Sequence, residues 1–342
     1  NFKIPLLIGG ATTSKAHTAV KIEEHYSKGN TIYVSDASRS VNVVSKLLDG
    51  KQKSEFSEQV RNEYSKIRDR VRASRKKRVL LSYNDANQNK PNFFDAGYTP
   101  TTPSFTGTKE FINYPLENLV DFIDWTPFFI TWGLAGKYPA ILTDKKIGSA
   151  AAEVFRDANT LLKRIINEKL LSAHAIIGFW PATAHGNDVK VELTDDSTAT
   201  FHFLRQQVKL TDKPSLCLAD YIKPDCSQGK DYLGGFVVST GFGAEALSKE
   251  FESGENDYDA LLVKALADRL AEAFAEKMHQ EVRKTFWGYA PDEKLGQESL
   301  IAEKYIGIRP APGYPACPEH SEKETLFKAL RAEESLGVAL TE

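Results

Sequence analysis

The sequence of 342 residues predicts an α+β domain with an antiparallel sheet and long helices, preceded by a partial, doubly wound, Rossmann-like α/β segment. Three observations support this fold class. The first 50 residues alternate twice between a short apolar run and a helical pattern, which is typical of a parallel sheet. Residues 175–239 hold four strand-like runs without intervening helical patterns, which is typical of an antiparallel sheet. A helical stripe of apolar residues then covers 258–287.

Composition and charge exclude several classes of protein. Hydrophobic residues make up 41% and charged residues 26% of the chain, as in soluble globular proteins of roughly two domains. The net charge of −2 disfavours a nucleic-acid binder, and the absence of a run of about 18 apolar residues disfavours a membrane span. Three cysteines, Cys217, Cys226 and Cys317, without a Cys-x-x-Cys pair, predict neither a disulfide framework nor a metal site. They favour a reducing, cytoplasmic setting.

Residues 1–50 read as half of a doubly wound domain. An apolar strand at 4–8 ends in the tight turn Gly9-Gly10, and a helix follows to about Tyr26. A second strand at 31–34 leads through the next turn into a helix that ends near Leu48. Two strands cannot form a stable doubly wound sheet, so we expect the missing strands upstream and this chain to be a fragment.

The next two segments read as connections. Residues 51–74 predict a charged helical linker with one narrow apolar stripe, formed by Phe56, Val60, Tyr64, Ile67 and Val71. The basic run at its end, 75–78, favours a solvated helix terminus over a nucleic-acid contact. Residues 82–114 are rich in Asn, Pro, Thr and Gly and predict an extended covering segment.

A second domain follows from about Leu116. An amphipathic helix is expected around 154–166. Four strands are expected at 175–180, 189–193, 200–204 and 236–239. The long helix over 258–287 closes this pattern of helix, strand meander and helix.

Two short motifs each allow a functional and a structural interpretation. The Gly-Gly-Ala-Thr-Thr-Ser turn at 9–14 lies between a strand and a helix, where backbone N–H groups suit a phosphate or a polar cofactor edge. It could equally be a close turn with polar caps, because neither dinucleotide-binding nor P-loop spacing is present. Asp124 precedes an aromatic run, so it could hold a cationic or hydroxylated ligand, or it could cap the turn into Trp125–Phe129.

The stretch 309–318 is the most unusual part of the sequence. Four prolines in ten residues fix the backbone and remove hydrogen-bond donors, so neither a helix nor a central strand can form. A rigid loop would hold Arg309 and Tyr314 at set positions and lose little entropy when a ligand binds. The alternative is a structural crossover that covers an apolar face, and we favour the ligand-binding interpretation.

Seven stretches, in order, resemble cobalamin-dependent methionine synthase. They are IPLLIGGATTS (4–14), DASR (36–39), IDWTPFF (123–129), GKYP (136–139), GFWPA (178–182), ADRLAEAFAE (267–276) and GIRPAPGYP (307–315). The resemblance covers essentially the whole chain, and the last stretch is highly specific.

The resemblance implies a domain boundary and a function for each part of the chain. Residues 1–50 would end the cobalamin-binding domain, 51–74 would be the linker, and 75–342 would be the activation domain, which binds S-adenosylmethionine. The whole enzyme transfers a methyl group from 5-methyltetrahydrofolate to homocysteine through cobalamin. The activation domain restores methylcobalamin from cob(II)alamin with a methyl group from S-adenosylmethionine and an electron from a flavodoxin or flavodoxin-like reductase.

The resemblance also implies site residues. S-adenosylmethionine contacts map to Asp124, Arg309, Ala311 and Tyr314, with Glu303 nearby. Arg309 would bind the ligand carboxylate, Asp124 its α-amino group, Ala311 its adenine or sugar edge through the backbone, and Tyr314 would form an aromatic wall. Three backbone positions would line the cobalamin nucleotide tail: Gly9, Gly10 and Ala37.

Two departures from the family pattern limit what this chain is expected to do alone. The Asp-x-His-x-x-Gly motif that ligates cobalt is absent and is expected upstream, together with the zinc-bearing and other upstream domains. The activation domain is expected to continue past Glu342, so we assign no catalytic residue and expect the fragment to be inactive. The alternatives are a non-catalytic docking module for the reductase and the cobalamin domain, and an ordinary nucleotide-binding α/β enzyme that uses Gly9-Gly10.

Overall fold

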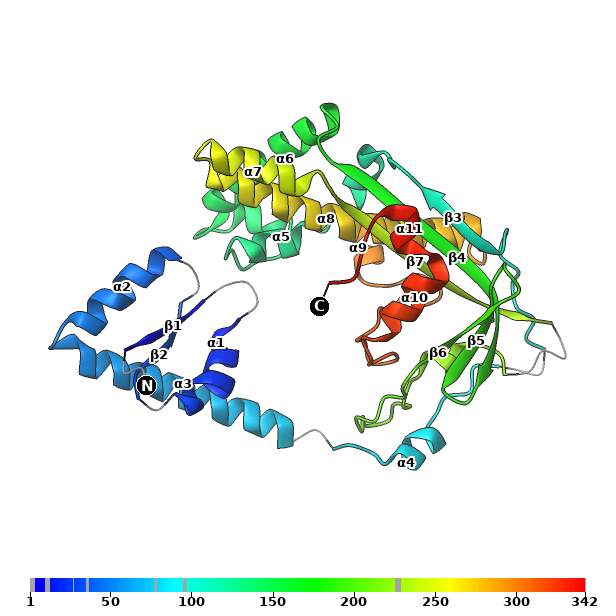
Figure 1. Ribbon diagram of the computed structural model, residues 1–342, viewed down its shortest axis with the longest axis horizontal. Helices are drawn as coiled ribbons and strands as arrows, with labels where there is room; N and C mark the ends of the chain where they lie inside the picture. Colours follow the sequence, from blue (N-terminus) through cyan, green and yellow to red (C-terminus); the bar gives the residue numbers. More distant parts are fainter. Residues whose placement is uncertain are drawn as a thin grey trace. The chain divides into compact units, whose positions relative to one another are not determined.

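The computed structural model describes residues 4–9, 13–26, 28–34, 37–76, 79–94, 97–224 and 229–341. The chain divides into two compact units, Asn1–Leu81 and Ser82–Glu342 (Figure 1). No helix in these described ranges is both long and apolar enough to cross a membrane.

The first unit is built on two parallel strands. Strand β1 (Leu6–Ile8) pairs with β2 (Thr31–Tyr33), and the predicted helix between them is a short α1 (Lys15–His17) followed by a π-helical and a 3₁₀ turn. Ser14 caps α1, because its side chain accepts a hydrogen bond from the His17 backbone N–H. Helix α2 (Ala37–Leu48) follows β2. The expected β-α-β-α order is therefore present.

Helix α3 (Gln52–Lys76) is part of this unit rather than a free connection. Its Phe56 and Val60 pack against the buried residues of β2 and α2. Tyr64, 1% exposed, accepts a hydrogen bond of 2.7 Å from the backbone N–H of Tyr33 in β2. The apolar stripe predicted for the linker helix thus faces the sheet, and burial of that stripe attaches the helix to the unit.

The second unit contains a five-stranded antiparallel sheet, which confirms the α+β class. Its strands are β3 (Gly107–Phe111), β4 (Ser172–His185), β5 (Asp188–Glu192), β6 (Thr198–His202) and β7 (Asp231–Phe242). Strand β7 pairs along most of β4, while β3 and β5 pair with successive parts of β4 and β6 pairs with β5. All of these pairs are antiparallel. The predicted four strands are present, and β4 and β7 are longer than predicted.

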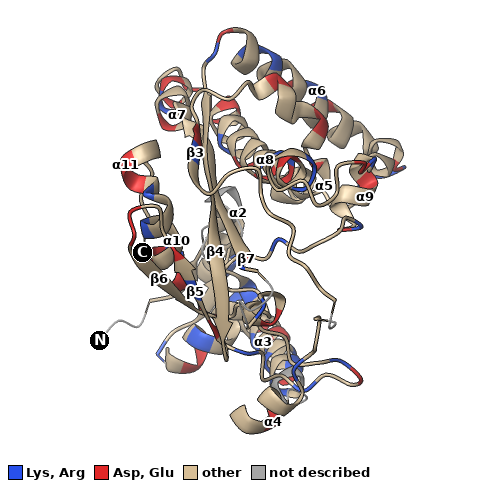
Figure 2. Cartoon of the chain, turned by 90° about the vertical axis from the view of Figure 1, so that its right-hand side faces the viewer, with Lys and Arg blue, Asp and Glu red and all other residues tan. Residues whose placement is uncertain are grey.

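Both faces of β4 are buried. Its odd-numbered residues, such as Ile177 and Phe179, belong to one apolar core, and even-numbered residues, such as Ile176 and Trp180, belong to another. This follows from the alternation of side chains along a strand. Figure 2 shows α5, α6 and α8 on one side of the sheet and α10 and α11 on the other.

The helices on the first face include the two that were expected around 154–166 and over 258–287, together with α7, which was not expected. They are α5 (Trp125–Thr131), α6 (Gly148–Asn167), α7 (Ala244–Ser253) and α8 (Asp257–Glu281), and α8 continues into a π-helical turn (Val282–Phe286). A short α9 (Gln297–Ile301) follows, and α10 (Glu322–Leu330) and α11 (Ala332–Leu336) cover the other face. Acidic and basic residues are interspersed over both units (Figure 2), in keeping with the near-zero net charge.

The segment 82–114 is more regular than expected, since it contains α4 (Tyr83–Gln88) and β3. A buried arginine anchors its beginning. Arg205 forms a two-pronged ion pair with Asp220 and donates a hydrogen bond of 3.1 Å to the side chain of Asn87 in α4. Further on, Ser104 donates backbone and side-chain hydrogen bonds to the carbonyl of Phe286. These contacts hold the segment against the second unit.

Candidate functional site

The end of α8 and the loop that follows it bring together a cluster of polar side chains. Its members are Glu276, His279, Arg283, Glu293, Tyr305 and Arg309. Its two arginines, Arg283 and Arg309, differ in burial and in the number of hydrogen bonds that they donate.

Each guanidinium nitrogen of Arg283 has a hydrogen-bond partner within the protein. Its side chain is fully buried and donates from Nε and Nη2 to both carboxylate oxygens of Glu293, at 2.8 and 2.7 Å. Its Nη1 lies 2.7 Å from Nδ1 of His279, and its guanidinium lies 4.4 Å from the ring centroid of Tyr305. Because arginine only donates, Nδ1 of His279 must be an unprotonated acceptor. Burial, with the charges of Arg283 and Arg309, lowers the pKa of His279 to about 3, so this ring is neutral at physiological pH.

Arg309 pairs with Glu276 and also interacts with the side chain of Tyr305. Its Nη2 donates to Oε2 of Glu276 at 2.7 Å, and the two side chains are 26% and 14% exposed. Arg309 Nε and Glu276 Oε1 are buried and have no hydrogen-bond partner within the described part of the chain. Burial raises the pKa of Glu276, against the opposing effect of Arg309 and Arg283.

The proline-rich loop is neither helix nor strand, as predicted. Three backbone hydrogen bonds fold it into consecutive turns: Gly313 to Cys317, Tyr314 to Ala311, and Cys317 to Tyr314. Gly313 has φ of 104°, and a Cβ at this position would lie 2.3 Å from the ring of His320. Cys317 is buried beneath the turns, whereas Ala311 is exposed and the side chain of Tyr314 is 59% exposed.

Asp124 and Glu303 are placed by helix ends. Asp124 is the N-cap of α5, and its Oδ1 accepts a hydrogen bond of 2.9 Å from the Thr126 backbone N–H. Its neighbour Ile123 accepts a hydrogen bond of 2.6 Å from the side chain of Gln297 at the start of α9. Glu303 lies just beyond α9, is exposed, and contributes to the raised pKa of Glu276. The capping role foreseen for Asp124 is therefore present, and a ligand role stays a prediction.

The residues predicted to face cobalamin lie in the first unit. Gly9 follows β1, and a Cβ there would lie 2.7 Å from the carbonyl oxygen of Val34. Ala37 is the first residue of α2, after β2. Gly9 and Ala37 thus lie at the carboxyl ends of two parallel strands, where α/β sheets bind ligands. Gly10 lies outside the described residues.

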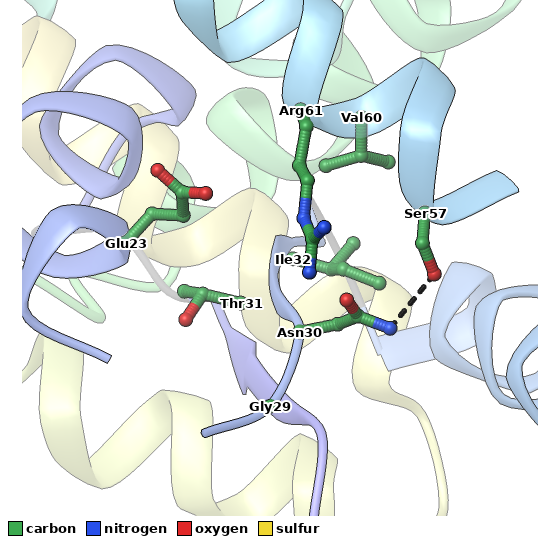
Figure 3. A pocket seen from close by; sticks show the side chains of 8 residues that line it. All are labelled: Glu23, Gly29, Asn30, Thr31, Ile32, Ser57, Val60 and Arg61. Carbon is green, nitrogen blue, oxygen red and sulfur yellow. Dashed lines mark hydrogen bonds between the residues drawn. The ribbon is translucent and has the colours of Figure 1, made fainter. Parts of the chain in front are cut away.

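A small pocket in the first unit involves none of the predicted site residues. It lies at the amino end of β2, with room for about one water molecule, between Glu23, Asn30, Thr31 and residues of α3 (Figure 3). The Asn30 side chain donates a hydrogen bond of 2.8 Å to Ser57 across it. The described residues bring together no group of three His, Cys, Asp or Glu side chains that could hold a metal ion.

The polar residues of α8 that surround Arg309 were not predicted from the sequence, because the pattern at 258–287 was interpreted only as a core helix. Glu276, His279 and Arg283 lie three and four residues apart, so they share one side of the helix. Such a polar series beside an apolar stripe was the signal available in the sequence.

Comparison with known proteins agrees with this picture. A protein-family model described as vitamin B12 dependent methionine synthase, activation domain, matches residues 115–342. A crystal structure of the MetH reactivation domain bound to AdoHcy is 45% identical, with a TM-score of 0.72 over 77% of this chain and 82% of that chain. The resemblance found in the sequence is confirmed, and this chain belongs to the family of activation domains of vitamin B12-dependent methionine synthase.

Proposed function

We propose that this chain binds S-adenosylmethionine beside Arg309, and that it supports the reductive methylation of cob(II)alamin to methylcobalamin within methionine synthase. The observation that carries the proposal is Arg309 itself. One carboxylate oxygen of Glu276 accepts a hydrogen bond from its guanidinium. Arg309 is also the first residue of the proline-rich loop, whose turns are fixed by prolines and backbone hydrogen bonds. The AdoHcy bound to the related structure supports the ligand class, because AdoHcy is S-adenosylmethionine without its transferable methyl group.

Each proposed contact uses a group whose chemistry suits it. Arg309 has five N–H donors and uses one for Glu276, so donors remain for the ligand carboxylate. Thr126 occupies one oxygen of Asp124, and the other oxygen suits the α-amino group of the ligand. The exposed backbone of Ala311 suits the adenine or sugar edge, and the exposed ring of Tyr314 suits an aromatic wall. The carboxylate of Glu303 adds negative charge that favours a sulfonium cation.

In the same proposal, the first unit would contact the nucleotide tail of cobalamin. The closeness of Gly9 to the Val34 carbonyl leaves no space for a side chain at this position, and Gly9 itself is exposed at the carboxyl end of β1, where α/β sheets bind ligands. Cobalamin, when bound, would supply the cobalt that accepts the methyl group. The electron would come from a partner, a flavodoxin or flavodoxin-like reductase, and the upstream domains would complete the enzyme.

A docking module without a ligand pocket of its own is the competing function. The capping contact of Asp124 favours it, since that carboxylate already has a structural role. Calorimetric titration with S-adenosylmethionine, AdoHcy and ATP separates the possibilities. We expect S-adenosylmethionine and AdoHcy to bind and ATP, which lacks the amino-acid group, not to bind. Binding of ATP alone would favour a nucleotide-binding enzyme, and binding of none would favour the docking module.

A further inference from the structure

The two arginine–glutamate pairs of the cluster differ in a way that bears on ligand binding. Arg283 and Glu293 form a two-pronged pair with both partners buried, which leaves no carboxylate oxygen without a hydrogen bond. Arg309 and Glu276 share one hydrogen bond and remain partly exposed. The Arg283–Glu293 pair therefore has no carboxylate oxygen left for another donor. In the Arg309–Glu276 pair, the guanidinium can still donate hydrogen bonds to a second carboxylate.

The prolines of the loop do not explain how the Arg309 side chain is oriented. Proline fixes the backbone at 310, 312 and 315, but a long arginine side chain keeps several rotatable bonds beyond its Cα. Glu276 can supply the missing constraint because it lies on α8, a helix of 25 residues. Its neighbours Phe274 and Met278 are almost completely buried, so the backbone beneath Glu276 is held by the core.

The charged surroundings of Glu276 leave Arg309 as its hydrogen-bonding partner. Arg283 lies within electrostatic range, but Glu293 and His279 already accept its hydrogen bonds. His279 is neutral, and Glu303 and Glu293 repel the charge on Glu276. Loss of the Glu276 charge would therefore remove the carboxylate that holds the Arg309 guanidinium.

We propose that Glu276 is a positioning residue, which orients Arg309 for the carboxylate of S-adenosylmethionine. This inference rests on the proposed function. Glu276 acts only through Arg309, so its contribution to ligand affinity exists only while Arg309 is present. A residue that merely stabilised the fold would show no such dependence.

A double-mutant cycle tests the dependence by calorimetric titration with S-adenosylmethionine. Glu276→Gln should weaken binding about tenfold, the factor expected for one charge-assisted contact, and Glu276→Asp should retain part of the affinity. In an Arg309→Ala background, Glu276→Gln should change the affinity less than about twofold, because there is nothing left to orient. The matched control is Glu281→Gln, on the same helix, which breaks a 2.6 Å pair with Lys277 and should leave binding unchanged.

The pH profile gives a second readout that does not require a variant to fold. Protonation of Glu276 removes its charge, and burial raises the pKa of this carboxyl, so wild-type affinity should fall on acidification, beginning above the pH range of an ordinary glutamate. The profile of Glu276→Gln should be flatter. Two results would overturn the positioning role and leave the proposed function standing. One is a wild-type affinity that does not fall on acidification. The other is a Glu276→Gln variant that binds like the wild type while Arg309→Ala does not. A wild-type chain that binds no ligand would overturn both.

Discussion

At the scale of single residues, burial decides what each polar group in the cluster can do. The side chain of Arg283 is buried and each of its guanidinium nitrogens has a partner, so this residue stabilises the fold. Arg309 lies in the same cluster but is partly exposed, and its Nε has no hydrogen-bond partner within the described residues. Truncation of a buried, paired charge leaves its partner unpaired and is costly. The Arg283–Glu293 pair therefore stabilises the fold, and Arg309 is the arginine that we propose for ligand recognition.

Asp124 combines a cap with a proposed ligand contact, and two substitutions separate these roles. Asp124→Asn keeps the cap, since asparagine caps helices as well as aspartate does, but it removes the charge offered to the α-amino group. Asp124→Ala loses both and should lower the free energy of unfolding by about 1 kcal/mol. Melting temperature and S-adenosylmethionine affinity, measured on both variants, report on the two roles. An Asp124→Asn variant with wild-type affinity would remove Asp124 from the ligand site.

His279 should make the second unit sensitive to acid. Its pKa is lowered from 6.5 to about 3, so the unfolded chain takes up a proton at a higher pH than the folded chain does. The associated stability is fully present above about pH 6.5 and is lost as pH falls toward 3, at up to about 1.4 kcal/mol per pH unit. His279→Gln keeps an acceptor for Arg283 and should make the free energy of unfolding less dependent on pH.

Urea unfolding of both proteins at about pH 7 and about pH 5, followed by tryptophan fluorescence, measures this difference. His202→Gln, a change at an exposed ring on β6, is the matched control. Equal pH dependence in the wild type and His279→Gln would mean that His279 is not the acid-sensitive group.

At the scale of elements, α3 shows how a helix with a charged surface can still be structural. Tyr64 supplies the buried acceptor for the Tyr33 N–H, so Tyr64→Phe should leave that donor unsatisfied and weaken β2 by about 1–3 kcal/mol. Hydrogen exchange of the β2 amides should accelerate accordingly. Tyr26→Phe is the control, because it removes a contact to the exposed carbonyl of Ile4 that water can replace. Unchanged exchange in Tyr64→Phe would show that α3 does not support the sheet.

Elements with a clear period could be predicted from the sequence, and those fixed by distant contacts could not. The helices α6 and α8 and the strands β4 and β5 follow their apolar periodicity. Strand β3 was missed because its sequence, Gly-Thr-Lys-Glu-Phe, has little alternation, and pairing with β4 makes it a strand. The stripe on α3 was identified, but the surface that it covers depends on the fold.

The same distinction holds at the candidate site. Four prolines predict the rigid loop, and the position of Asp124 directly before the aromatic run predicts its role as a cap. The pairing of Arg309 with Glu276 joins residues 33 positions apart, on elements whose approach is set by the tertiary structure. No local pattern specifies such a pair.

At the scale of the whole molecule, the two units carry different parts of the proposed activity. The second unit has a sheet covered on both faces and holds Arg309, Asp124 and the proline-rich loop. Among its described residues the first unit has two parallel strands, and α2 leaves Val41 and Leu48 largely exposed. Parallel sheets are normally covered on both faces, so this unit is suited to further packing contacts.

The central claim is that Arg309 anchors S-adenosylmethionine, and calorimetric titration of the wild type and Arg309→Ala side by side tests it most directly. We expect the wild type to bind and Arg309→Ala to lose about 2–3 kcal/mol of binding free energy, the range for a hydrogen bond to a charged group. Arg309→Lys should recover only part of this, because the planar guanidinium is lost. Arg331→Ala, at an exposed arginine paired loosely with Asp195, should bind like the wild type. Equal affinity in the wild type and Arg309→Ala would contradict the account.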